Sequence, residues 1–383
     1  MMKIKKAFIL ISNAFIALVL LQTCLKPIPD MILSGAEKKV RMPYFTLSDW
    51  INREFQNRME QWLKQNLGFR GFFVKTDNQI NYTLFNEFSR NHPRKLILGK
   101  NKYLYEEPYI DLYNRISVAG LNSMEETAAS LKSLQDVLKK HKVEFLLIIT
   151  PSKTSIYPEY IPEKVIIRKN LSKKDSYQIF IPLLKRYGVN FLDGRKLFLA
   201  LKKQSVPNLF PTSGSHWSLY GSYLFDTSLI EQMERLLGKR LVRIASRGIV
   251  RSREPIDLDK DIARLGNILF TRSLFTEYLY PDTYPDAPSG AYRPNILLVG
   301  SSFCWNIIHY LDINRVFSRL DFYYYFNTDY VYPGKKRNRI DKDRVDWNRD
   351  VLTRDIVIIE VNEVAMDENG YQFIETALRG LER

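Results

Sequence analysis

The pattern of apolar and polar positions divides the chain into three parts. An almost uninterrupted apolar run extends from Ala7 to about Leu25. Residues 46–88 instead carry apolar side chains at three- and four-residue steps, which is typical of amphipathic helices. From about Lys95, short continuous apolar runs alternate with amphipathic segments, and this alternation predicts strands separated by helices.

The first apolar run is long enough to cross a membrane. At ~1.5 Å per residue, a helix over this run nearly matches a hydrocarbon core of about 30 Å. Lys3, Lys5 and Lys6 precede it, which predicts a cytoplasmic N-terminus and export of everything after Pro27. A cleaved signal peptide, a lipoprotein signal at "LQTC" and a buried soluble helix are the alternatives; we predict an uncleaved signal anchor.

The rest of the pattern gives the expected elements. In the second part the apolar positions Trp50, Phe55, Met59, Trp62 and Leu63 predict a helix that ends at Gly68. Beyond it, we predict strands over "KLILG", "KYLYEE", "VEFLLIITP", "VNFLD", "PNILLVG", "LDFYYYF" and "DIVIIEV". Helices are predicted over 121–141, capped by Asn122 or Ser123, over 174–187, after Ser218, from about Phe303 and from about Asp367.

Strands rich in Ile, Leu and Val that alternate with helices predict an α/β fold with a mostly parallel sheet flanked by helices. We expect a cytoplasmic tip and anchor at 1–26, a helical connecting section at 27–92, and the α/β domain at 93–383.

Composition narrows the function classes. A hydrophobic content of 45% and a charged content of 26% are typical of a folded protein. With only Cys24 and Cys304, the chain has neither a disulfide framework nor a cysteine-based metal site, and we expect no metal and no cofactor. The formal net charge of +15 on an exported protein points to anionic lipid or an acidic polymer, and no motif indicates nucleic-acid binding.

Two polar turns lie beside predicted strands. In "GSHWS", His216 stands on a loop that enters a helix; a capping or space-filling histidine is the structural alternative. In "LLVGSSF", Ser302 follows a strand at the turn into a helix, where free backbone N–H groups can stabilise an oxyanion; helix capping by Ser301 or Ser302 is the alternative. A serine nucleophile needs a base, and His216 is the best-placed histidine.

These motifs, in the order anchor, helical section, "LLIITPSK", "GSHWS", "LLVGSSF" and "DIVIIEVNE", resemble the AlgJ/AlgX-like alginate O-acetyltransferase branch of SGNH-hydrolase-like proteins. The resemblance implies an SGNH-hydrolase-like domain, Ser302 as the acyl-accepting nucleophile and His216 as the base. It also implies an exopolysaccharide substrate, an MBOAT-type membrane partner, and a single-pass inner-membrane protein whose catalytic domain lies in the periplasm or outside the cell.

The chain departs from the family pattern at the third triad position. The family has an aspartate two residues before the histidine, and here that residue is Gly214. Glu360 and Glu363 are the candidates for the orienting carboxylate, with surface charge at a strand end as the alternative, and Asn362 is a candidate oxyanion donor. If the site instead works as a Ser–His pair, Gly214→Asp should raise the rate.

Further residues are candidates for substrate binding. Lys153 in "TPSK" follows a predicted strand, and a solvated lysine is its alternative interpretation. Between the last two strands, Tyr330, Tyr332 and Trp347 can stack on sugars, and the basic residues Lys335, Lys336, Arg337 and Arg339 can attract acidic groups. A solvated loop with a few buried aromatic residues competes with this interpretation.

The sequence therefore predicts an O-acyltransferase, most simply an O-acetyltransferase, that modifies a cell-surface exopolysaccharide through an acyl-Ser302 intermediate. A polysaccharide acetylesterase and a non-catalytic polysaccharide-binding or assembly protein are the alternatives.

Overall fold

The computed structural model describes residues 2–35, 40–88, 95–116, 118, 120–366 and 370–381. The chain forms two compact units: the first comprises Met1–Leu96 and Ala263–Ser273, and the second Ile97–Ile262 and Leu274–Arg383. The division into 1–26, 27–92 and 93–383 stays a prediction.

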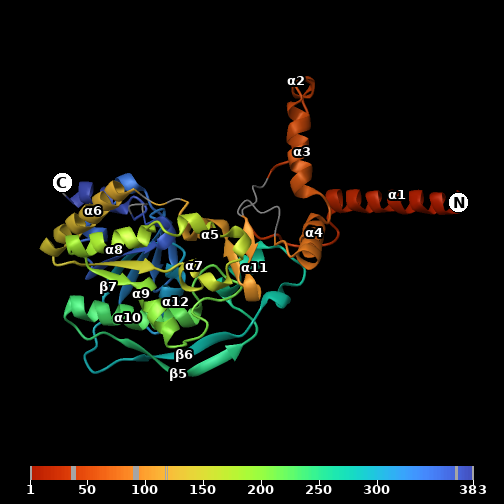
Figure 1. Ribbon diagram of the computed structural model, residues 1–383. Helices are drawn as coiled ribbons and strands as arrows, with labels where there is room; N and C mark the ends of the chain where they lie inside the picture. Colours follow the sequence, from red (N-terminus) through yellow and green to blue (C-terminus); the bar gives the residue numbers. More distant parts are fainter. Residues whose placement is uncertain are drawn as a thin grey trace. The chain divides into compact units, whose positions relative to one another are not determined.

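The first unit is built from the helices α1 (Met2–Leu25), α2 (Leu47–Ile51), α3 (Glu54–Asn66) and α4 (Arg70–Phe85) (Figure 1). Within α1, Lys3–Leu25 has a mean hydropathy of 2.2, so this helix fits a single-pass membrane anchor. α3 ends at Asn66, and Gly68 lies directly against α1: its N–H donates to Thr23 Oγ1 at 2.8 Å. A Cβ on Gly68 would come within 2.5 Å of the Val19 carbonyl oxygen, so this contact requires glycine.

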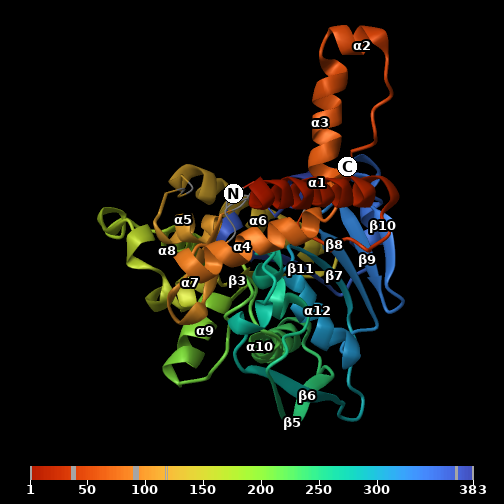
Figure 2. The same cartoon turned by 90° about the vertical axis from the view of Figure 1, so that its right-hand side faces the viewer.

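The centre of the second unit is a seven-stranded sheet with the order β10-β9-β8-β7-β11-β3-β4 (Figure 2). The five strands from β8 to β4 are parallel, and an antiparallel hairpin of β9 and β10 extends the sheet beyond β8. The sheet strands are β3 (Glu144–Thr150), β4 (Phe191–Asp193), β7 (Asn295–Gly300), β8 (Arg319–Tyr324), β9 (Thr328–Tyr332), β10 (Lys336–Arg339) and β11 (Ile356–Asn362).

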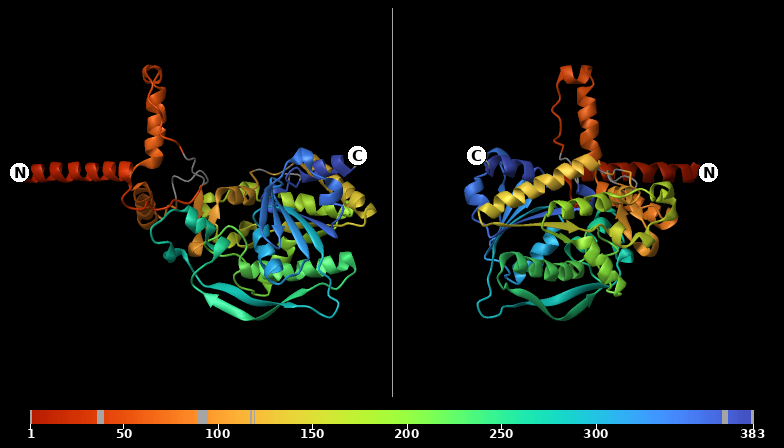
Figure 3. Two further views of the ribbon diagram at one scale, coloured as in Figure 1. Left: turned by 180° about the vertical axis from the view of Figure 1, so that it is seen from behind. Right: turned by 60° about the vertical axis from the view of Figure 1, so that its left-hand side comes forward.

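Alternate residues of the central strands enter two separate cores, because successive side chains of a strand point to opposite faces. In β3, Leu146 and Ile148 join one cluster, whereas Phe145, Leu147 and Ile149 join the other. The first face is covered by α9 (Gly194–Lys203), α10 (Leu219–Leu237) and α12 (Cys304–Ile313), and the second by α6 (Leu121–Lys140), α8 (Ser176–Tyr187) and α14 (Phe373–Leu381) (Figure 3). The predicted α/β fold with a mostly parallel sheet between helices is therefore confirmed.

Local signals account for most of the helix boundaries. Ser218 caps α10 as predicted, with its hydroxyl accepting from the N–H of Gly221. α6, however, is capped at Gly120 and not at Asn122 or Ser123. The last helix, α14, begins at Phe373, and the predicted start near Asp367 falls on residues outside the described ones.

The structure contains two antiparallel ribbons that were not predicted. One pairs β5 (Arg243–Ser252) with β6 (Tyr278–Asp286) and runs along α10 (Figure 3). The other is the β9–β10 hairpin, in a segment for which no strand beyond "LDFYYYF" was predicted. The remaining elements are β1 (Leu96–Leu98), β2 (Leu104–Glu106), α5 (Glu107–Tyr113), α7 (Lys153–Ile156), α11 (Asp261–Leu265) and α13 (Trp347–Asp350).

Candidate active site

Ser302 lies at the carboxyl edge of the parallel sheet, where sites of open α/β folds gather. β7 ends at Gly300, and a short turn leads into α12, which begins at Cys304. The turn is held by local hydrogen bonds, since the Ser301 hydroxyl accepts from the N–H of Phe303 at 3.2 Å. Of the two serines, Ser301 is therefore the one that caps the turn, and the Ser302 side chain is directed elsewhere.

His216 lies on the loop between α9 and α10, and the packing of its neighbour Trp217 in the core holds this loop in place. The neighbouring Trp217 is fully buried among Phe198, Phe225 and Phe303. The His216 ring itself packs on Phe303, with ring centroids 4.7 Å apart. Because Phe303 follows Ser302 directly, this contact brings the histidine loop to the serine turn.

A continuous chain of hydrogen bonds joins three side chains at this point. His216 Nε2 lies 2.7 Å from Ser302 Oγ, and His216 Nδ1 lies 2.6 Å from Asp261 Oδ2. The side chains of His216 and Asp261 are 13% and 20% exposed, so the site is accessible but mostly shielded. A nucleophile, a base and an orienting carboxylate in this order form the arrangement of a serine triad.

The orienting carboxylate was not among the residues predicted from the sequence. Asp261 is the first residue of the short helix α11, and its other oxygen, Oδ1, accepts from the backbone N–H groups of Ser215 and Ile262 at 2.7 and 2.6 Å. It lies 45 residues from His216 along the chain, within a segment that had no predicted element. No short motif links the two positions, so spacing alone could not identify it.

Gly214 is explained by packing. A Cβ at this position would lie 2.5 Å from the Leu258 carbonyl oxygen and 2.9 Å from Pro211 Cγ. The segment that delivers Asp261 thus runs where an aspartate at 214 would have to fit. With glycine at 214, the orienting carboxylate was expected to come from elsewhere in the chain or to be absent. In this geometry Asp261 lies in that place, and the candidates Glu360 and Glu363 do not.

Glu360 supports the serine turn and does not contact His216. It is fully buried at the end of β11, and its carboxylate accepts from Thr150 Oγ1 at 2.5 Å and from the Ser301 N–H at 2.7 Å. Burial raises the pKa of Glu360, and these hydrogen bonds oppose that shift. Its role in the structure is to hold the backbone of the turn that carries Ser302.

Glu363 and Asn362 have structural partners on the other side of the sheet edge. Glu363 Oε2 accepts from the Ser152 N–H at 2.7 Å, and Oε1 lies 3.2 Å from the Arg195 guanidinium. The Asn362 amide donates to Thr150 Oγ1 at 3.1 Å, and its Oδ1 accepts from the Val364 N–H. Neither residue is directed at Ser302, in contrast to the sequence-based expectation.

As a candidate substrate-binding residue, Lys153 was expected to face a cleft. In the structure it is buried instead. It is 2% exposed, and its ammonium group donates to three backbone carbonyl groups. The sequence did not indicate Tyr325, which lies near the nucleophile: burial raises the pKa of its hydroxyl, and the neighbouring Ser302 opposes that shift.

The aromatic candidates of the 320–347 segment are packed into the fold. Tyr332 is buried, Tyr330 packs on Trp305 at 4.9 Å between ring centroids, and Trp347 packs on Phe373 at 5.8 Å. Tyr330 and Trp347 are half-buried, and a sugar-stacking role for these rings stays a prediction.

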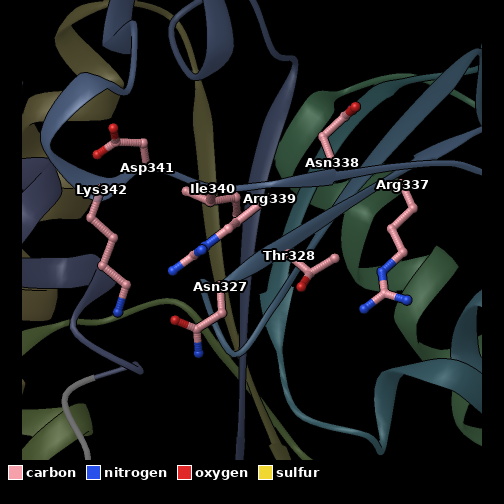
Figure 4. Close-up of a pocket in the computed structure, with 8 residues that line it drawn as sticks. All are labelled: Asn327, Thr328, Arg337, Asn338, Arg339, Ile340, Asp341 and Lys342. Carbon is pink, nitrogen blue, oxygen red and sulfur yellow. The ribbon is translucent and has the colours of Figure 1, made fainter.

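Three basic residues of the same segment, Arg337, Arg339 and Lys342, line a hollow of about 940 Å³ (Figure 4). Arg337, Arg339 and Lys342 extend to one side, whereas Asn338 extends to the other. In the strand register, Arg339 of β10 pairs with Thr328 of β9, and Thr328 pairs with Tyr324 of β8. Tyr324 in turn pairs with Gly300 at the end of β7, so one end of the hollow lies at the same edge of the sheet as Ser302. Three strand spacings of ~4.8 Å separate β10 from β7. Lys335 and Lys336 are not among its lining residues.

Within the residues that the structure describes, no group of three or more His, Cys, Asp or Glu side chains is arranged to hold a metal ion.

Part of the chain is similar in sequence to a known protein. The chain is 27% identical over 143 residues to a probable alginate O-acetylase AlgJ from Pseudomonas syringae pv. tomato, an alignment that covers 37% of this chain. It spans about a third (33%) of that relative's own length.

Two solved structures are similar in outline. The O-acetyltransferase domain of Pseudomonas putida AlgJ has a TM-score of 0.48 and 17% identity, covering 72% of this chain and 92% of that domain. Bacillus cereus PatB1 with a sulfonyl adduct has a TM-score of 0.48 and 12% identity, covering 73% and 98%.

A family model described as the SGNH hydrolase-like domain of acetyltransferase AlgX matches residues 96–311, which is more than half of the chain. This range includes Ser302, His216 and Asp261, and it confirms the resemblance inferred from the "GSHWS" and "LLVGSSF" motifs. The chain therefore belongs to the AlgX family of SGNH hydrolase-like acetyltransferase domains.

Proposed function

We propose that this protein transfers an acyl group, most simply acetyl, to hydroxyl groups of a cell-surface polysaccharide through an acyl-Ser302 intermediate. The observation that carries the proposal is the chain of hydrogen bonds from Ser302 Oγ through His216 to Asp261, at 2.7 and 2.6 Å. Membership of an acetyltransferase family supports the reaction type, and the AlgJ relative's name supports a polysaccharide acceptor.

The first half-reaction loads the serine. With the proton of the neutral imidazole on Nδ1, where Asp261 accepts it, Nε2 is free to take the Ser302 hydroxyl proton. The serine oxygen forms a bond to the carbonyl carbon of the acyl donor, and the negative charge of the tetrahedral oxyanion develops beside the turn between β7 and α12. The imidazolium then returns its proton to the leaving group as the carbonyl re-forms, which leaves acyl-Ser302.

The second half-reaction transfers the acyl group from Ser302 to the polysaccharide. A polysaccharide hydroxyl gives its proton to His216 Nε2 and bonds to the acyl carbon. The Ser302–acyl bond breaks, and the proton passes from His216 to the Ser302 oxygen. The product is the O-acylated polymer, and the serine is restored. In the transferase a sugar hydroxyl takes the place that water has in an esterase.

The cellular setting is part of the same proposal. α1 fits a single-pass anchor, and we propose that it lies in the inner membrane with the α/β unit in the periplasm. By family resemblance, an MBOAT-type membrane protein would deliver the acyl group across that membrane. The exposed Arg337 and Arg339 favour an acidic acceptor, since guanidinium groups pair well with carboxylates.

The test compares Ser302→Ala with its neighbour Ser301→Ala in cells that make the polymer. Ser302→Ala should abolish polymer acylation. Ser301→Ala should lose only the turn hydrogen bond from the Phe303 N–H, worth about 0.5–1.5 kcal/mol of stability, and remain active. His216→Ala should be nearly as damaging as Ser302→Ala, and the double variant no worse than either, because members of one catalytic unit are not additive. Full acylation by a folded Ser302→Ala variant would exclude the proposal.

A further inference from the structure

Lys153 is a buried cation whose hydrogen bonds all go to the backbone. It is the first residue of α7, directly after β3, and only 2% of it is exposed. Its ammonium group donates to the carbonyl oxygens of Leu104 at 2.9 Å, Thr212 at 3.0 Å and Gly214 at 2.7 Å. Since an ammonium group has three N–H donors, these three bonds use all of them.

Such an arrangement needs a reason, because burying a charge is costly unless its hydrogen bonds are satisfied. The ammonium lies over the rings of Tyr103 and Tyr105, 5.2 and 5.5 Å from their centroids, and none of the described carboxylates forms an ion pair with it. The stabilisation it provides therefore goes to carbonyl groups, and two of the three belong to a single loop, Thr212–Gly214.

That loop leads directly to His216. On its other side, the Ser213 hydroxyl donates to the Asp259 carbonyl at 2.6 Å, and the Ser215 N–H donates to Asp261 Oδ1 at 2.7 Å. The loop is thus held between Lys153 and the segment that carries Asp261. Without the ammonium, the Gly214 carbonyl loses the donor that the structure gives it, two residues before His216.

We propose that Lys153 is a positioning residue for the Ser302–His216 pair: its ammonium group fixes the Thr212–Gly214 backbone and thereby the distance from His216 Nε2 to Ser302 Oγ. The inference rests on the proposed function, since it concerns the reactivity of Ser302. It assigns no contact between Lys153 and the substrate.

The protonation of Lys153 gives this role a distinctive pH dependence. Burial lowers its pKa to about 7, and Asp261, Glu106 and Asp259 oppose that shift. A neutral amine has only two N–H donors for three carbonyls, so the loop should loosen and Ser302 should become less reactive as the pH rises above about 7. The other titratable groups facing Lys153 are Tyr103 and Tyr105, whose pKa values burial raises, so they stay neutral in this range.

Loss of the Lys153 proton should affect the free energy of unfolding in the opposite direction to the reactivity of Ser302. Above the lowered pKa of folded Lys153, the unfolded chain binds more protons than the folded chain, so this group makes stability rise with pH. A loss of reactivity at alkaline pH without a loss of stability therefore separates positioning from a purely structural role.

The experiment uses the full-length protein and a small fluorophosphonate probe that labels activated serines, so that polymer binding is not involved. Lys153→Met should label at least about tenfold more slowly than wild type, since displacements of about 1 Å can cost about 10²-fold in rate. It should also lose the alkaline fall in labelling. Lys164→Met, at an exposed site, is the matched control and should label normally.

Two further measurements cover a variant that folds poorly. Lys153→Ala should regain labelling with millimolar propylammonium, and wild-type labelling should fall above about pH 7 while its melting temperature does not. A folded Lys153→Met variant that labels at the wild-type rate, or wild-type labelling that stays flat to alkaline pH, would overturn the inference. Folded wild-type protein that is not labelled at all would overturn the proposed function itself.

Discussion

The carbonyl oxygen of Leu258 lies 2.5 Å from the point where a Cβ on Gly214 would be. Leu258 belongs to the segment that continues to Asp261, and Asp261 is the residue that meets His216 Nδ1. The glycine two residues before the histidine and the aspartate from a distant segment are therefore two parts of one arrangement: the backbone that delivers the carboxylate occupies the space beside residue 214.

Gly214→Asp should lower activity. Its Cβ would force the backbone of the 257–261 segment away, and overpacking of this kind costs typically about 1–3 kcal/mol. Gly214→Ala should lose a similar amount of stability, because the clash begins at the Cβ. Thermal unfolding and polymer acylation measure both effects; an active, stable Gly214→Asp variant would contradict the packing account of this glycine.

Asp261→Asn should leave a folded protein with turnover reduced by up to ~10⁴-fold, because an amide can hold the histidine in the wrong tautomer. Asp286→Asn, at an exposed end of β6, is the control and should be unaffected. The rate of serine labelling, measured beside thermal unfolding, gives the result. A loss of less than about tenfold would argue for a Ser–His pair that works without a carboxylate.

Asp226→Asn should stabilise the protein at neutral pH. Asp226 is fully buried in α10, neither of its carboxylate oxygens has a hydrogen-bond partner among the described residues, and burial raises its pKa well above the ordinary value. A raised pKa means that stability is fully present below the ordinary value, about 3.9, and is lost as pH rises through the folded pKa.

The stability gain of Asp226→Asn over wild type should therefore grow with pH. Denaturant unfolding at acid and neutral pH measures it, with the exposed Glu231→Gln on the same helix as control. An unchanged difference across this range would show that Asp226 does not titrate between the two states.

The arginines of β10 should contribute to acceptor binding. Arg337→Gln together with Arg339→Gln should raise the KM for an acidic polymer by about tenfold, equivalent to about 1.4 kcal/mol, and weaken its dependence on salt. Lys336→Gln removes a cation from the other face of the same strand and should change KM little. Labelling of Ser302 by a small probe should be normal in both variants; a slower labelling rate would indicate misfolding.

The sequence predicted the elements whose signal is local. Continuous apolar strands such as "VEFLLIITP", and the cap at Ser218, depend on nearby residues and were found where expected. The sequence also predicted that Ser302 and the His216 loop belong to one site, because the carboxyl ends of parallel strands meet at the same edge of the sheet.

What could not be predicted depends on contacts between distant segments. Asp261 reaches His216 from a short helix in the connection between β5 and β6, and nothing in the residues around it distinguishes this aspartate from its neighbours. In the sequence, a solvated lysine was the simplest interpretation of Lys153, and only the folded structure shows its ammonium group bonded to three backbone carbonyl groups. In the sequence, Tyr330 and Tyr332 fit a sugar-stacking role and a core role equally well. In the structure Tyr332 is buried, and Tyr330 packs on Trp305 while remaining half-buried.

The central claim is that Ser302 carries the acyl group between donor and polymer. The most direct measurement is mass spectrometry of the full-length protein after exposure to an activated acyl ester, with and without the acceptor polymer. The account predicts one acyl ester on the peptide that contains Ser302, its disappearance when polymer is added, and its absence from Ser302→Ala. Polymer acylated at the normal rate while Ser302 stays unmodified would contradict it.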